Sequence, residues 1–270
     1  MTNCEVCKGK KLDDWGKIGN KRMWVCKDCG LGMIKGVKEQ YVQYHRDEDY
    51  RKLEDIYENM LQKRVEIIKR FVSRGSVLEI GSSQGTMLNL FKKQGFEVLG
   101  IEPSKEAAKR AKLMGIETIT SDFLKTKLNS GIFDVVIMNH VLEHLDDLRA
   151  TLKEAKRVLK KGGYLYLDVP NFGGLRAKIF KKKWRYLLPD EHKWQFTPTS
   201  LSYLLKDYGF EVMMCESRSG IWENSKPLRS LTNDLIKLRK RFLKSIVDLI
   251  PDSIVTWLNL GDSMGILARK

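Results

Sequence analysis

Residues 77–88 read VLEIGSSQGTML, and they are the most informative part of the sequence for the fold. Branched apolar residues lead through an acid into two glycines four positions apart, and a helix-like apolar pattern follows directly. Glycine adopts positive φ without steric cost and allows a ligand to approach the backbone closely. Gly81 and Gly85 therefore predict a tight turn between a strand and a helix whose unpaired N–H groups face a bound ligand.

The chain from residue 76 onward alternates short apolar strands with amphipathic helices. Strands are expected at 76–80, 96–102, 116–120, 133–139 and 163–169. Helices are expected at 84–94, 104–114 and 146–159. This alternation is typical of an α/β fold in which helices cover both faces of a parallel sheet. Ligands of such sheets bind at the carboxyl ends of the strands, where the glycine turn lies.

An acid at the end of the second strand indicates what binds there. Glu102 closes the run VLGIEPS, and a carboxylate at this position can accept hydrogen bonds from the hydroxyls of a ribose. Together with the glycine turn, it indicates a cofactor that carries a nucleoside. The glycines do not follow the G-x-G-x-x-G spacing, so the pattern of dinucleotide-binding proteins is not met.

These features resemble the class I S-adenosylmethionine-dependent methyltransferases. The resemblance covers roughly residues 55–217 and the final strand, and it extends to SDF at 121–123, FDVVIMNHVLEHLDD at 133–147 and LKKGGYLYLDVPN at 159–171. It implies an enzyme with a Rossmann-like, doubly wound sheet of seven strands, the last of them antiparallel. Ser83 stands where the family often has a glycine.

The resemblance also assigns cofactor contacts, first in the glycine turn at Glu79, Gly81, Ser83 and Gly85. Glu79 would anchor the turn and reach the methionine amino group of S-adenosylmethionine, because a carboxylate favours a nearby ammonium. The remaining contacts would come from the ends of later strands: Glu102 to the ribose, Asp122 to the adenine amino group, Phe123 to the adenine ring, and Asn139 facing the cofactor.

Three of the four histidines are candidate catalytic residues. Methyl transfer requires in-line positioning of the acceptor, and it requires a base where the acceptor has a proton to lose. His140 and His144 lie in NHVLEHL with the spacing of one helical face, and His192 lies in the loop LPDEHKWQFTP. A packing or capping role is the alternative for each of them, and for His144 above all. No HExxH motif is present, so these residues imply no catalytic metal.

Four of the five cysteines form two CxxC pairs near the N-terminus, namely Cys4, Cys7, Cys26 and Cys29. This spacing predicts a zinc ribbon over residues 1–36, in which four thiolates hold a structural Zn²⁺ and leave no position for a reacting water. Two disulfides are the alternative, which a reducing compartment disfavours. The fifth cysteine, Cys215, is expected to be a buried apolar residue.

The rest of the chain divides into a linker helix at residues 37–72 and a methyltransferase domain at 73–270. Insertions are expected within that domain at 172–196 and 222–260. Residues 227–258 carry a basic amphipathic pattern, which suits either peripheral contact with an anionic membrane or packing as a lid or subunit contact. The sequence does not indicate an oligomeric state.

The net charge of +15 in 270 residues is concentrated toward the C-terminal third, chiefly at 176–193 and 226–244. Clustered lysine and arginine attract polyanions, although a solvated surface gives the same composition. We see neither a leader segment nor an apolar run long enough to cross a bilayer. The expected location is therefore the cytoplasm, with peripheral membrane contact left open.

Three functions remain as hypotheses. The ribbon and the HKWQFTP loop resemble methyltransferases of sugar, polysaccharide and natural-product pathways, which favours a small-molecule or lipid-linked acceptor. The first alternative is a ribosomal or transfer RNA methyltransferase that holds phosphates through its basic segments. The second is a non-catalytic adapter that keeps the cofactor fold as a scaffold.

Overall fold

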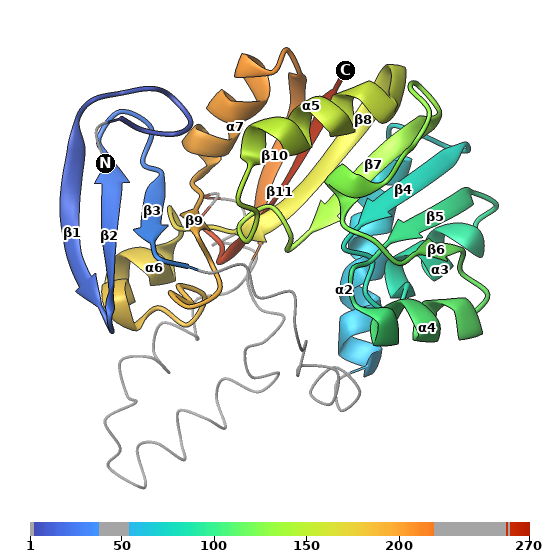
Figure 1. The fold of residues 1–270 in the computed structure, drawn as a ribbon, viewed down its shortest axis with the longest axis horizontal. Coiled ribbons are helices and arrows are strands. Elements are labelled where there is room, and N and C mark those ends of the chain that lie inside the picture. The colour runs from blue at the N-terminus through green and yellow to red at the C-terminus, as the bar shows by residue number, and fades with distance from the viewer. Residues whose placement is uncertain (1–2, 38–53, 219–257, 259) are drawn as a thin grey trace, which may run out of the picture.

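The computed structural model describes residues 3–37, 54–218, 258 and 260–270, and all structural statements refer to these residues. A seven-stranded sheet lies beside a smaller four-stranded sheet (Figure 1). The strands of the large sheet are, in chain order, β4 (Ser76–Ile80), β5 (Glu97–Ile101), β6 (Thr118–Ile119), β7 (Phe133–Asn139), β8 (Leu159–Pro170), β10 (Glu211–Arg218) and β11 (Ser263–Arg269).

The spatial order of the large sheet is β10-β11-β8-β7-β4-β5-β6. Neighbours from β8 to β6 pair in parallel, whereas β11 is antiparallel to both β8 and β10. The predicted Rossmann-like sheet with an antiparallel last strand is confirmed.

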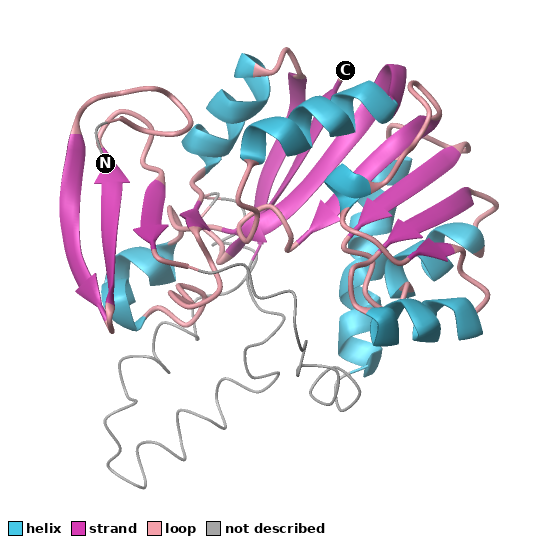
Figure 2. Cartoon of the chain, viewed as in Figure 1, coloured by secondary structure: helices cyan, strands magenta, loops and turns pink. Residues whose placement is uncertain are grey.

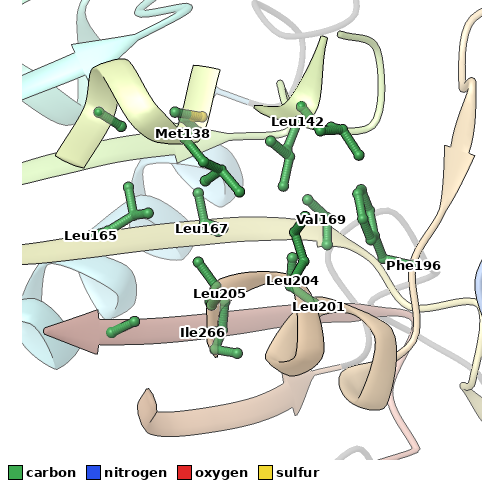
Figure 3. Packing of buried hydrophobic residues seen from close by; sticks show 14 of the residues in the cluster. Met138, Leu142, Leu165, Leu167, Val169, Phe196, Leu201, Leu204, Leu205 and Ile266 are labelled. Atoms are coloured by element: carbon green, nitrogen blue, oxygen red, sulfur yellow. The ribbon is translucent and has the colours of Figure 1, made fainter. Parts of the chain in front are cut away.

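Side chains of the central strands alternate between two hydrophobic cores, as the pleat requires. Leu78 and Ile80 of β4 belong to one core, and Val77 belongs to the other. The first core is covered by α5 (Leu148–Val158) and α7 (Pro198–Asp207), the second by α2 (Glu54–Lys69) and α3 (Thr86–Lys92). Figure 3 shows the first core, where Met138 of β7, Leu167 of β8 and Leu204 of α7 lie together.

The small sheet contains β1 (Leu12–Ile18), β2 (Lys21–Cys26), β3 (Gly32–Lys35) and β9 (Trp194–Gln195), in that order. The last of these strands comes from the predicted insertion at 172–196, and it pairs antiparallel with β3 (Figure 2). The same insertion contains α6 (Leu175–Phe180) and a 3₁₀ turn at Lys181–Lys183. The N-terminal ribbon is therefore hydrogen-bonded to a segment that follows the fifth parallel strand in the chain.

Other predictions fall partly or wholly outside the described residues. Of the predicted linker helix at 37–72, the described part contains α2. The predicted helical insertion at 222–260, with its basic amphipathic stretch at 227–258, lies outside the described residues, apart from residues 258 and 260. None of the described helices is long and apolar enough to cross a membrane.

Candidate active site

The glycine turn after β4 has the backbone that the sequence predicts. Gly81 and Gly85 have φ values of 70° and 80°. A Cβ on Gly81 would lie 2.5 Å from Cγ2 of Val141, so a side chain there would displace the neighbouring loop. Ser83 also has positive φ, at 48°, a conformation that costs a non-glycine residue energy unless the surroundings fix it.

Glu102 supplies that fixation from the residue after β5. Its carboxylate accepts hydrogen bonds from the backbone N–H of Ser83 at 2.9 Å and of Ser104 at 2.8 Å. Each carboxylate oxygen keeps further lone pairs, so the group can still accept a ribose hydroxyl. The sequence predicted the ribose contact but not this second role, in which Glu102 ties the glycine turn to the start of α4 (Lys105–Leu113).

Glu79 is a buried acid next to this turn. Burial raises the pKa of Glu79 to about 8. The negative charge of Glu102 adds to this rise, and the positive charge of Arg64 opposes it. Its Oε2 atom has no hydrogen-bond partner. A buried carboxylate is stable only when a hydrogen-bond donor or a cation lies next to it. The methionine ammonium, which Glu79 is predicted to contact, would be such a partner.

Two more buried polar atoms near the strand ends have no partner, Oγ of Ser82 and Oδ1 of Asn139. Asn139 ends β7, and β4, β5 and β7 run in parallel, so their carboxyl ends lie at one edge of the sheet (Figure 1). Native proteins rarely leave several buried polar atoms unsatisfied in one place. The grouping fits a ligand that carries both donors and acceptors, as S-adenosylmethionine does.

The two residues predicted to contact adenine, Asp122 and Phe123, already have partners within the chain. Asp122 accepts a hydrogen bond at 2.8 Å from the N–H of Leu124 and so caps a 3₁₀ turn at Phe123–Lys125. Phe123 is 6% exposed and packs in the first hydrophobic core. The structure thus gives both residues a local structural role, and their contacts to adenine stay predictions.

The pH dependence of stability offers a test of Glu79. Its pKa rises from 4.5 to about 8 on folding, so the stability it contributes is fully present below pH 4.5 and is lost as pH rises toward 8. Glu79→Gln is expected to raise the free energy of unfolding by up to about 3 kcal/mol at pH 7. Urea denaturation at pH 4 and pH 7 measures this, and an equal difference at both pH values would contradict it.

The segment after β7 differs from the prediction. Residues 140–147 form turns and bends, and α5 begins only at Leu148. The predicted helical face of His140 and His144 is therefore wrong. Two local features explain this: His140 has a φ of 55°, and the Asp147 side chain caps α5 by accepting from the N–H of Ala150.

The three predicted histidines nevertheless meet, because all of them lie close to Glu143. His140 Nδ1 is 3.2 Å from Glu143 Oε1, and its Nε2 is 3.6 Å from Oδ1 of Asp168. The rings of His144 and His192 lie 4.7 Å apart in an edge-on arrangement. Sequence reasoning missed Glu143, although it stands next to His144 in the motif.

The surroundings of His192 keep its imidazole neutral. Burial, against the favourable charge of Glu143, lowers the pKa of His192 to about 3. His192 is 4% exposed, and its Nδ1 lies 2.9 Å from the carbonyl oxygen of Tyr186. A group of such low pKa is a weak proton acceptor at neutral pH, which argues against the predicted role of His192 as a base.

The four predicted zinc ligands are also brought together. Sγ of Cys4 lies 3.6 Å from Sγ of Cys29, and Sγ of Cys7 lies 3.5 Å from Sγ of Cys26. All four sulfur atoms lie within 4.8 Å of one another, and all four cysteines are free thiols. The separations are too long for disulfides and suit four ligands around one tetrahedral ion.

Comparisons with known proteins agree with this geometry. The chain is 31% identical over 136 residues to an uncharacterized protein of Methanocaldococcus jannaschii. The match covers 50% of this chain and 64% of that protein. It is 24% identical over 221 residues to the C-methyltransferase NovU of Streptomyces niveus, covering 76% of this chain and 51% of that enzyme. The chain thus spans between half and two thirds of the length of these relatives.

A solved S-adenosylmethionine-dependent methyltransferase of Thermotoga maritima shares the fold. It has a TM-score of 0.59 and 19% sequence identity, and the match covers 84% of this chain and 95% of that one. The family model described as a methyltransferase domain matches residues 44–214. This match includes the glycine turn, Glu102 and the histidine cluster, and the chain therefore belongs to the methyltransferase domain family.

Proposed function

We propose that the protein transfers a methyl group from S-adenosylmethionine to a small-molecule acceptor, such as a sugar, a polysaccharide precursor or a lipid-linked intermediate. The observation that carries the donor half is the group of unpartnered polar atoms on Glu79, Ser82 and Asn139 beside the glycine turn. The similarity to a C-methyltransferase over 76% of this chain supports methyl transfer. The small-molecule acceptor rests on the resemblance of the ribbon and the HKWQFTP loop.

The donor would be held by residues that the structure places at one sheet edge. Glu102 receives the ribose hydroxyls, and Glu79 and Asn139 receive the methionine end. The sulfonium is already activated toward nucleophiles, so the chain's own task is to align the acceptor and accept its proton. We assign proton acceptance to His140, which is 30% exposed and borders the buried carboxylates of Glu143 and Asp168. His144 and His192 would line the acceptor side of the same cluster.

The first test is calorimetric titration with S-adenosylhomocysteine. Glu102→Gln keeps one acceptor oxygen for the backbone but removes the charge that holds the ribose. Because hydrogen bonds to a charged group contribute about 1.5–3 kcal/mol, the dissociation constant should rise roughly 10- to 100-fold. Glu97→Gln, an exposed acid at the other end of β5, is the matched control and should bind as the wild type does. Unchanged affinity in Glu102→Gln would refute the ribose assignment.

One observation favours the RNA alternative enough to include it in this test. A cavity of about 550 Å³ is lined by five basic residues, one acid and one tyrosine: Arg149, Lys153, Lys156, Arg157, Lys270, Asp207 and Tyr208. Such a basic surface can hold phosphates. Repeating the titration with a short structured RNA distinguishes the two: salt-dependent RNA binding that alters cofactor affinity would favour the RNA methyltransferase. Failure to bind S-adenosylhomocysteine at all would favour the adapter.

We also propose that Cys4, Cys7, Cys26 and Cys29 hold a structural Zn²⁺. Four thiolates are the ligand set of closed zinc sites, and three of these cysteines are buried, which leaves little access for a reacting water. The ion would join the two CxxC turns, which meet at the same end of the β1–β2 hairpin, and would hold β3 in place for its pairing with β9.

A further inference from the structure

The described part of the chain holds a second group of metal-ligating side chains besides the four cysteines. Glu143, His144 and His192 each present a ligand atom, and these atoms all lie within 4.8 Å of one another. Ligand atoms at about 2.1 Å from one ion are separated by roughly 3.4 Å in a tetrahedral site, so small side-chain movements would close the group around an ion.

Both imidazoles are already oriented by backbone carbonyls. Nδ1 of His144 lies 3.1 Å from the carbonyl oxygen of Glu191, and Nδ1 of His192 lies 2.9 Å from that of Tyr186. A carbonyl oxygen can only accept, so each Nδ1 carries the proton and each Nε2 carries a lone pair. Metal-ligating histidines have this arrangement, in which the outer partner fixes both the tautomer and the direction of the ring.

One carboxylate oxygen of Glu143 has no hydrogen-bond partner. Glu143 is fully buried, its Oε1 is 3.2 Å from Nδ1 of His140, and its Oε2 has no partner. Its backbone carbonyl accepts from the N–H groups of Lys193 and Trp194, so the segment of His192 is tied directly to Glu143. A buried carboxylate oxygen without a partner is costly, and a cation would complete it.

We propose that Glu143, His144 and His192 form a binding site for one divalent transition-metal ion. Two imidazoles and one carboxylate suit ions such as Zn²⁺, Co²⁺, Mn²⁺ and Fe²⁺, and three protein ligands leave coordination positions open. The site follows directly after β7, at the same sheet edge as Asn139. An open position there would take an oxygen of the acceptor and polarise it; this role rests on the proposed function, whereas the binding site rests on the geometry alone.

Titration with Co²⁺ tests the site in the full chain after the ribbon has been filled with a single equivalent of Zn²⁺, which the four thiolates take first. We expect one further equivalent to bind, with visible ligand-field absorption and without the thiolate charge-transfer band that cobalt in the ribbon would give. Mn²⁺, which has little affinity for thiolates, should bind at the same stoichiometry and compete with Co²⁺.

Variants connect this signal to the three residues. Glu143→Gln and His144→Asn should each weaken Co²⁺ binding at least 10-fold. His144 is only partly buried, so its variant remains informative if Glu143→Gln fails to fold. Asp146→Asn removes an exposed carboxylate two residues from His144 and should bind Co²⁺ as the wild type does.

Two outcomes would overturn the site: no binding of Co²⁺ or Mn²⁺ beyond the ribbon, or binding that both variants leave unchanged. S-adenosylhomocysteine titrations of the same samples separate this inference from the proposed function. Cofactor binding without the second metal would refute only the metal site. Metal binding without cofactor binding would refute only the proposed function.

Discussion

Cys26→Ser is expected to release the Zn²⁺ that we propose for the ribbon and to destabilise the whole described fold. Cys26 and Cys29 are buried in the same hydrophobic core as β8, α5 and α7. On the other side of the small sheet, Met23 and Ile34 pack with Trp184 of the predicted insertion at 172–196. Structural zinc contributes directly to folding energy, so the melting temperature should fall by at least about 10 °C.

Thermal unfolding and metal analysis on the same samples measure this effect. Cys215→Ser is the matched control, because Cys215 lies on β10 away from the cluster and burial raises the pKa of its thiol to about 11. It should keep its zinc and its melting temperature. Metal retained at full stoichiometry in Cys26→Ser would refute the ribbon. Loss of zinc with an unchanged melting temperature would instead show that the ribbon folds as an independent unit.

The sequence predicted those parts of the fold that local patterns determine. Short, nearly continuous apolar runs between amphipathic helices located the five parallel strands, because a strand buried on both faces must be apolar along its length. Gly81 and Gly85 located the turn after β4. The backbone there has positive φ, which glycine adopts at little steric cost and which most other residues avoid. The CxxC spacing likewise located the four cysteines that the structure brings together.

The sequence could not predict features that depend on tertiary partners. The strand β9 has two residues and exists only because β3 lies beside it. Glu143 was missed because its neighbours His140 and His144 were expected on a helix, where Glu143 would not face both. Arg64 was missed because an arginine in an amphipathic helix is usually exposed, yet here the whole residue is only 1% exposed.

Arg64→Met is expected to lower the free energy of unfolding by about 3–5 kcal/mol, because it removes the hydrogen-bonded cation from the buried carboxylate of Asp168. Nε of Arg64 donates to Oδ2 of Asp168 at 2.7 Å, and both side chains are 2% exposed. Asp168 also accepts from the hydroxyls of Ser263 and Tyr166. Arg64 therefore connects α2 to β8 and, through Asp168, to the histidine cluster at His140.

The loss should depend on pH with a definite sign. Burial alone would raise the pKa of Asp168, but the charge of Arg64, helped by His140 and Arg218, lowers it to about 2. The stability that Asp168 contributes is thus present above its unfolded pKa of 3.8 and is lost as pH falls toward 2. Urea denaturation should show the deficit of Arg64→Met at pH 7 and a smaller deficit at pH 4, where the unpaired Asp168 can take up a proton.

Lys63→Met is the matched control for this variant, since Lys63 is the preceding basic residue of α2 and is exposed. Its free energy of unfolding should stay within about 0.5 kcal/mol of the wild type. The double variant Arg64→Met with Asp168→Asn removes both charges and should recover part of the loss, because a neutral amide is less costly to bury than an unpaired carboxylate. No recovery would mean that Arg64 stabilises the protein through the packing of its side chain and not through the ion pair.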